Sequence, residues 1–176
     1  MPHIHTKPGQ HDHTASAFIV RLDFDEPKIM LHKHKKLGVY MQFGGHIELN
    51  ETPWQAISHE IPEETGYEMS QLKILQPIQR LKKVSRSVLH PIPVCHNTHV
   101  VVDDHYHTDL DYAFVATQPP TDKVADGESS DIKLFTKQEL LEHPVDDIFQ
   151  EVVDITLFIF DVCLSGWDRI STDSFK

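Results

Sequence analysis

The stretch from residue 39 to residue 67 constrains the fold of this chain more than any other. Residues 39–43 predict a strand, and Gly44 and Gly45 after it predict a loop whose backbone can approach an ion or a phosphate closely. Thr52 followed by proline is typical of a helix start, because proline has no amide hydrogen to lose at the first helical position. Gly66 predicts the end of that helix. The expected order is therefore strand, glycine loop, helix.

Three glutamates share one face of the predicted helix. Glu60, Glu63 and Glu64 are spaced three and four residues apart, which places their carboxylates about one turn from each other. Carboxylates this close repel one another, so the cluster is costly unless a cation neutralises it. Mg²⁺ and Mn²⁺ prefer oxygen ligands of this kind. The sequence thus predicts a Mg²⁺ (or Mn²⁺) site on this helix.

The same segment resembles the signature box of the Nudix hydrolases, G-x5-E-x7-R-E-U-x-E-E-x-G-U, in which U is an aliphatic or aromatic residue. The motif is long, and its fixed positions are mostly charged residues or glycines, so agreement by chance is rare. One fixed position departs, because His59 stands where the family has an arginine that pairs with the box glutamates. The positions that match in register are Gly45, Glu51, Glu60, Ile61, Glu63, Glu64, Gly66 and Tyr67.

The resemblance implies an α/β fold, namely a Nudix-like α/β/α sandwich with a mixed β-sheet between helices. It also implies a hydrolase that uses Mg²⁺ (or Mn²⁺) to cleave the diphosphate linkage of a nucleoside diphosphate derivative, a nucleotide pyrophosphohydrolase. The expected site consists of the catalytic Glu60, Glu63 and Glu64, the metal ligands Gly45, Glu60, Glu63 and Glu64, the substrate-binding His46 and Glu51, and Glu128 in a late loop as a possible alternative base.

Two features of the box leave other functions open. Histidine at position 59 cannot form the bidentate hydrogen bond that an arginine makes with a carboxylate. Pro62 removes a helical hydrogen bond to the carbonyl of Ser58 and is expected to kink the last turn. The alternative is a Nudix-like nucleotide-binding or sensor module with a degenerate, weakly active or inactive box. A third candidate acts on a non-nucleotide diphosphate such as an isoprenoid. Retention of all four box glutamates favours the enzyme.

The rest of the chain predicts strands interleaved with helices. Strands are expected at residues 17–22, 28–32, 73–78, 99–102, 112–116 and 132–135, the first two as a hairpin. Thr136 is expected to cap a short helix, a long amphipathic helix is expected over about residues 146–163, and residues 118–130 are expected to form a polar loop. The predicted organisation is a His-rich N-terminal arm at residues 1–14 and a single Nudix-like domain at residues 15–176.

The fourteen histidines fall into clusters. On a strand, His105, His107 and Asp109 would point to one face, which suits either a metal or phosphate site or a polar strand edge. The histidines between residues 3 and 13 suit either a soft metal or a mobile arm. His46 would either donate to a phosphate oxygen or pack beside the glycine loop.

Charge and hydropathy limit the partners. The net charge of -11 argues against a stable nucleic-acid complex held by phosphates. The expected partner is a small-molecule nucleoside diphosphate derivative, with a homodimer possible. The most apolar stretch, residues 155–164, is shorter than the ~20 residues needed to span a bilayer, so no membrane association is expected. Cys95 and Cys163 are far apart and indicate reduced thiols, which predicts a cytoplasmic protein.

Overall fold

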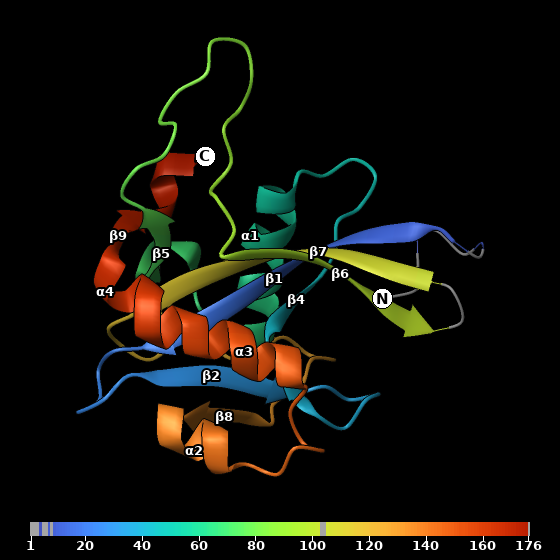
Figure 1. The fold of residues 1–176 in the computed structure, drawn as a ribbon, viewed down its shortest axis with the longest axis vertical. Coiled ribbons are helices and arrows are strands. Elements are labelled where there is room, and N and C mark those ends of the chain that lie inside the picture. Colours follow the sequence, from blue (N-terminus) through green and yellow to red (C-terminus); the bar gives the residue numbers. More distant parts are fainter. Residues whose placement is uncertain (1–3, 5–6, 8, 103–104, 176) are drawn as a thin grey trace.

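A computed structural model describes residues 4, 7, 9–102 and 105–175 and shows a mixed sheet with helices on both faces (Figure 1). This is the α/β sandwich that the sequence predicts. The strands are β1 (His11–Arg21), β2 (Lys28–Lys33), β3 (Tyr40–Met41), β4 (Phe43–His46), β5 (Leu72–Pro77), β6 (Cys95–Val102), β7 (His105–Ala116), β8 (Ile132–Phe135) and β9 (Trp167–Ser171).

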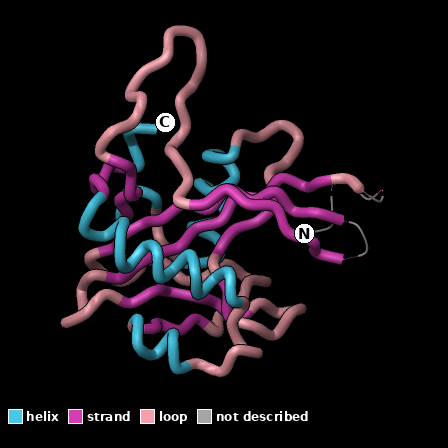
Figure 2. Tube along the Cα trace, viewed as in Figure 1, coloured by secondary structure: helices cyan, strands magenta, loops and turns pink. Residues whose placement is uncertain are grey.

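The centre of the sheet is a parallel pair of long strands, β1 and β7, which stay in register from His11 beside Tyr106 to Arg21 beside Ala116. The other pairings among the named strands are antiparallel. β1 pairs with β2 near its end and with β4 near its start, while β7 pairs with β5 and β6 in the same way. The sheet therefore splits around the central pair, and β1, β6 and β7 extend beyond the helices (Figure 2).

Alternation along β1 divides the core into two layers. Ala15, Ala17 and Ile19 pack on one face against apolar residues of the helix α1. Phe18 and Val20 pack on the other face, in the layer that includes residues of the C-terminal helices. This arrangement buries the strand on both sides and explains why its apolar run is nearly continuous.

Helix α1 (Pro53–Thr65) forms as its ends predict. The Thr52 side chain accepts a hydrogen bond from the Gln55 amide, and the Gln55 side chain accepts one from the Thr52 amide, which completes a capping box. Gly66 ends the helix in the left-handed conformation at φ 72°. The helix continues through Pro62, so this proline does not end it.

The remaining helices lie in the C-terminal half, apart from one short turn. Thr136 caps α2 as expected, again through a capping box. The predicted long helix begins only at Gln150, and after Phe158 it widens into a π-helical turn. These elements are the 3₁₀ turn η1 (Met69–Gln71), α2 (Lys137–Glu142), α3 (Gln150–Phe158), η2 (Ile159–Cys163), α4 (Leu164–Gly166) and the 3₁₀ turn η3 (Thr172–Phe175).

Other elements also differ from the sequence analysis, and β6 and β7 begin earlier than predicted, at Cys95 and His105. Gly44 and Gly45 lie inside β4 and pair with β1, so the predicted glycine loop is wrong. β1 begins at His11, within the segment predicted as an N-terminal arm. β9 was not expected, because its sequence from Trp167 to Ser171 alternates only weakly, and it forms by pairing with β5. Among the described residues, no helix combines the length and hydropathy needed to cross a bilayer.

Candidate functional site

Two of the three helix glutamates are buried between α1 and β4. The side chains of Glu60 and Glu64 belong to residues that are each only 7% exposed, whereas Glu63 is exposed. One oxygen of Glu64, Oε2, accepts a hydrogen bond of 2.7 Å from the backbone amide of Gly44. Glu64, the last glutamate of the box, therefore connects helix α1 to strand β4.

Gly44 allows this close contact because it has no side chain. Its φ of 132° is a conformation that L side chains rarely adopt. A Cβ at this position would lie 2.2 Å from the carbonyl oxygen of Ala15 on the neighbouring strand. Glycine here lets β4 pair with β1 and still direct its amide at Glu64.

Burial disfavours the ionised form of both carboxylates. The pKa of Glu60 is raised, first by burial and then by the charges of Glu63 and Glu128, although the adjacent His59 acts to lower it. Burial also raises the pKa of Glu64 to about 8, against the hydrogen bond from Gly44, and the charge of Glu60 adds to the rise. Adjacent buried oxygens that resist ionisation suit a hard divalent cation, which would favour the charged form of both. The donor set therefore fits Mg²⁺ or Mn²⁺.

These pKa values predict how the stability of the metal-free protein depends on pH. The pKa of Glu64 is raised on folding from 4.5 to about 8. The stabilisation from the neutral carboxyl is therefore full below its unfolded pKa and is lost as the pH rises through the folded one. We expect the melting temperature of metal-free protein to fall between about pH 4.5 and about pH 8 and to level off above that, and Mg²⁺ to raise it most at the higher pH. Calorimetry checks this, and a Glu64→Gln variant with the same fall would contradict it.

His59 contacts two glutamates of the box at once. Its Nδ1 lies 3.1 Å from Oε1 of Glu51, and its Nε2 lies 3.8 Å from Oε1 of Glu60. Oε2 of Glu51 in turn accepts a hydrogen bond from the amide of Glu48. Histidine cannot form a two-pronged bond with one carboxylate, but its two ring nitrogens here reach two different carboxylates. The position therefore still connects Glu51 to the helix.

The loop between β7 and β8 lies close to the same carboxylates. The amide of Ala125 donates to the carbonyl of Glu63 at 2.7 Å. At its other end, the hydroxyl of Ser129 donates to the carbonyl of Lys33 at 2.7 Å. Between these anchors, the charge of Glu128 acts on both buried box glutamates and raises the pKa of each. The structure thus brings the late-loop glutamate near the helix glutamates.

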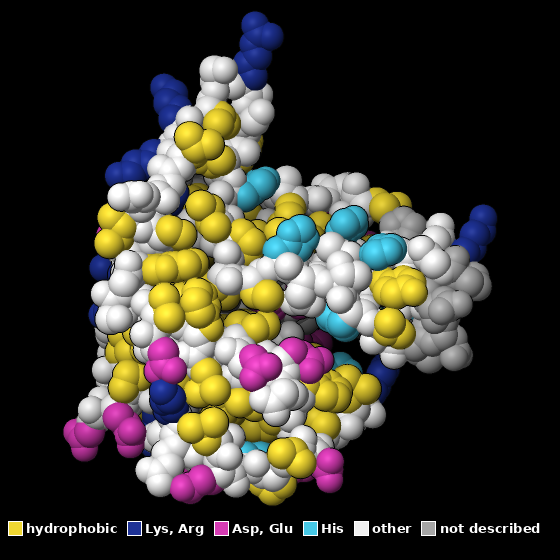
Figure 3. All heavy atoms as spheres, viewed as in Figure 1, with side chains coloured by type: hydrophobic (Ala, Val, Ile, Leu, Met, Phe, Trp, Pro, Cys, Tyr) yellow, Lys and Arg dark blue, Asp and Glu magenta, His cyan; other side chains and the backbone are white. Residues whose placement is uncertain are grey.

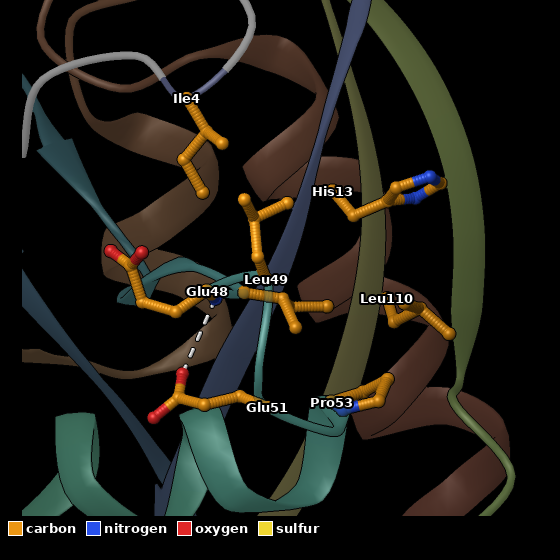
Figure 4. Close-up of a pocket in the computed structure, with 8 residues that line it drawn as sticks. Ile4, His13, Glu48, Leu49, Glu51, Pro53 and Leu110 are labelled. Atoms are coloured by element: carbon orange, nitrogen blue, oxygen red, sulfur yellow. Dashed lines mark hydrogen bonds between the residues drawn. The ribbon is translucent and has the colours of Figure 1, made fainter.

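A largely apolar pocket of about 270 Å³ opens at the start of α1. Figure 4 shows the Ile4 side chain directed toward Leu49, with Glu48 and Glu51 side by side at the margin of the pocket. Leu49 is 81% exposed, so the pocket is open to solvent. Glu51 both lines this pocket and contacts His59. The pocket is therefore adjacent to the carboxylate cluster.

The other predicted site residues lie on β4. Gly45 pairs with Ala15 on the face that α1 covers. His46 is directed to the opposite face, where its Nε2 lies 3.4 Å from Oδ2 of Asp12 and its ring contacts His107. Substrate binding by His46 stays a prediction, and its described neighbours belong to another cluster.

The predicted grouping of His105, His107 and Asp109 is only partly observed. His105 and His107 gather at Asp12, a residue that the sequence analysis did not single out. Asp109 instead accepts a hydrogen bond of 2.7 Å from Ser16. The pairing of β1 with β7 creates both contacts, and the alternation of polar residues on the two strands was the one signal available for them. His3 and His5 lie outside the described residues.

Comparison with known proteins agrees with the box. The family model described as NUDIX domain matches residues 12–154. A Nudix-family hydrolase from Clostridium perfringens is 29% identical, with a TM-score of 0.69 over 85% of this chain and 96% of that one. A Nudix hydrolase from Nitrosomonas europaea is 16% identical, with a TM-score of 0.61 over 95% and 97%. The C. elegans Ap4A hydrolase is 15% identical, with a TM-score of 0.59 over 84% and 95%. No curated protein matches the chain in sequence.

The fold, the box and the family match agree. The chain belongs to the Nudix hydrolase family. Members of this family generally use divalent metals.

Proposed function

We propose that this Nudix hydrolase cleaves the diphosphate linkage of a nucleoside diphosphate derivative with the help of Mg²⁺ or Mn²⁺. The observation that carries the proposal is the burial of Glu60 and Glu64 on one face of α1, with Glu64 held by the amide of Gly44. A sensor has no need of two buried carboxylates that repel each other, and the raised pKa of each supports a bound cation, which would favour the charged form. The free thiols of both cysteines are in keeping with the cytoplasmic location that we propose.

The residues that would hold the cation are Glu60, Glu64, Glu63 and the carbonyl of Gly45. When bound, a divalent ion neutralises phosphate charge and lowers the pKa of water. Glu60 and Glu64 supply oxygens from a largely dry interior, where their interaction with a cation is less screened than in solvent. Gly44 fixes one oxygen of Glu64 and leaves the other for binding.

A base must take the proton from the attacking water, and Glu63 and Glu128 are the two candidates. Glu63 is exposed at the end of the helix, next to the buried pair. Glu128 lies in the anchored loop, near enough for its charge to act on Glu60 and Glu64. We propose that Glu51, with the pocket beside it, binds the part of the substrate that lies beyond the diphosphate.

The proposal is tested by incubating the protein with nucleoside triphosphates, dinucleoside polyphosphates, nucleotide sugars, coenzyme A and an isoprenoid diphosphate. The likeness to an Ap4A hydrolase, although it extends to the fold alone, is the reason to include dinucleoside polyphosphates. We expect at least one nucleotide to be cleaved only when Mg²⁺ or Mn²⁺ is present, measured as released phosphate or by chromatography. Cleavage of the isoprenoid alone would overturn the substrate class. Binding of a nucleotide without cleavage would support the sensor.

Replacing His59 by arginine tests the connection between Glu51 and the helix. An arginine carries a permanent charge, and the N–H donors of its guanidinium group can bridge both carboxylates. We expect His59→Arg to lower the Mg²⁺ concentration needed for half-maximal activity several-fold, and His59→Ala to raise it, in Mg²⁺ titrations of the cleavage reaction. If neither variant differs from the parent, the contacts of His59 do not orient Glu60.

A further inference from the structure

A second cluster of metal-binding side chains lies on the other face of the sheet. Asp12 is fully buried, and His105 and His46 are each only 7% exposed. Oδ2 of Asp12 lies 3.3 Å from Nε2 of His105 and 3.4 Å from Nε2 of His46. The cluster is at the end of the sheet where β1 and β7 project beyond the helices (Figure 1).

Strand register explains how these residues meet. Asp12 on β1 pairs directly with His107 on β7, and His105 is two residues earlier on the same face. On the other side of β1, His46 on β4 pairs with Thr14, two residues after Asp12. The carboxylate is thus flanked by imidazoles from both neighbouring strands. Figure 3 shows histidine side chains gathered over β6 and β7 on this face.

The distances approach those of a tetrahedral zinc site. One ligand atom from each of Asp12, His105 and His107 lies within 4.8 Å of the others. Ligands at the usual 2.0–2.1 Å from zinc are about 3.3 Å apart, which is the Asp12–His105 separation. His107 needs only a small side-chain movement to complete the three-ligand set. A buried carboxylate among imidazoles also meets the rule that buried charges are paired or bind metals.

The chemistry of the donors separates this cluster from the box. Mg²⁺ prefers oxygen ligands, whereas imidazole nitrogen suits zinc. We propose that Asp12, His105 and His107 bind a Zn²⁺ ion, and that His46 and the amide of Ile4, which donates to Oδ2 at 3.0 Å, hold Asp12 in orientation. The ion connects β1 directly to β7 and, through His46, to β4. It stabilises the strand that carries Gly44 without taking part in hydrolysis.

Equilibrium dialysis against zinc tests the site, with Mg²⁺ in excess to occupy the box. We expect one Zn²⁺ per chain, and a rise in melting temperature on zinc addition. His105→Asn and His107→Asn should each weaken zinc binding at least about tenfold. His96→Asn is the matched control. His96 is exposed on β6 and pairs with Leu110, so it lies on the face that α1 covers and not on the face of the cluster. This variant should bind zinc as the parent does.

Zinc binding at this cluster is expected to be independent of the hydrolase activity. Glu64→Gln should keep the zinc site, so a failure of the proposed function leaves this inference standing. Because His107 is half-buried, His107→Asn is the variant expected to fold normally, which circular dichroism checks. No zinc uptake by the parent, or uptake that is unchanged in both His105→Asn and His107→Asn, would overturn the site.

Discussion

Glu64→Gln is expected to lower the metal-dependent cleavage rate by about a hundredfold or more. A metal ion contributes several kcal/mol of charge stabilisation to the transition state, and each ~1.4 kcal/mol corresponds to a factor of ten in rate. Glutamine keeps the shape of the side chain, and its carbonyl oxygen can still accept the amide of Gly44. The variant therefore removes the charge that we propose holds the cation, while preserving the contact between helix and strand. Steady-state kinetics on the substrate found in the screen measures the effect.

Two controls make this result specific. Glu151→Gln replaces an exposed glutamate at the start of α3 and should leave the rate unchanged. The Glu64→Gln protein should also lose the part of the pH dependence of its metal-free stability that comes from Glu64, while buried Asp111, whose pKa is also raised by burial, keeps its own contribution. Full metal-dependent activity in Glu64→Gln would show that Glu64 is not a ligand.

Gly44→Ala is expected to destabilise the protein by about 3 kcal/mol or more, since it combines backbone strain with a steric clash. The added Cβ would lie 2.2 Å from the carbonyl oxygen of Ala15 and 2.8 Å from the Cα of Ser16, both of which are backbone atoms of the central strand. Neither atom can move away without breaking the pairing of β1 with β4. Denaturant unfolding with Mg²⁺ absent measures the loss.

Gly38→Ala provides the matched control for this prediction. Gly38 also has a positive φ, of 71°, but nothing lies within 4 Å of its added Cβ. Its cost is limited to conformational strain of about 1 kcal/mol. If Gly44→Ala is no more destabilising than Gly38→Ala, the close approach of β4 to β1 does not limit stability.

The sequence predicted the helix of the box well because its ends are determined locally. Thr52, Gln55 and Gly66 act through hydrogen bonds to residues three or four positions away, so no knowledge of the rest of the chain is needed. The same holds for Thr136 and α2. The spacing of the box glutamates likewise predicted a shared helix face, although burial separates Glu63 from the other two.

Features that depend on distant pairing were missed. Gly44 and Gly45 have the composition of a loop, and only their pairing with residues 15 and 16 of β1 makes them part of a strand. Asp12 has no local pattern that marks it, because its partners His46 and His105 come from β4 and β7. The ability of His59 to reach two carboxylates also depends on where the segment before α1 places Glu51.

The loop that carries Glu128 is fastened at two places, to the end of α1 through Ala125 and to β2 through Ser129. We therefore expect this loop to stay in place when substrate binds, instead of acting as a mobile lid. New specificities would then arise more readily by exchanging side chains around the exposed Leu49, at the other end of the helix, than by remodelling this loop. Substrate recognition and the hydrolytic reaction would then be able to change independently of each other during evolution.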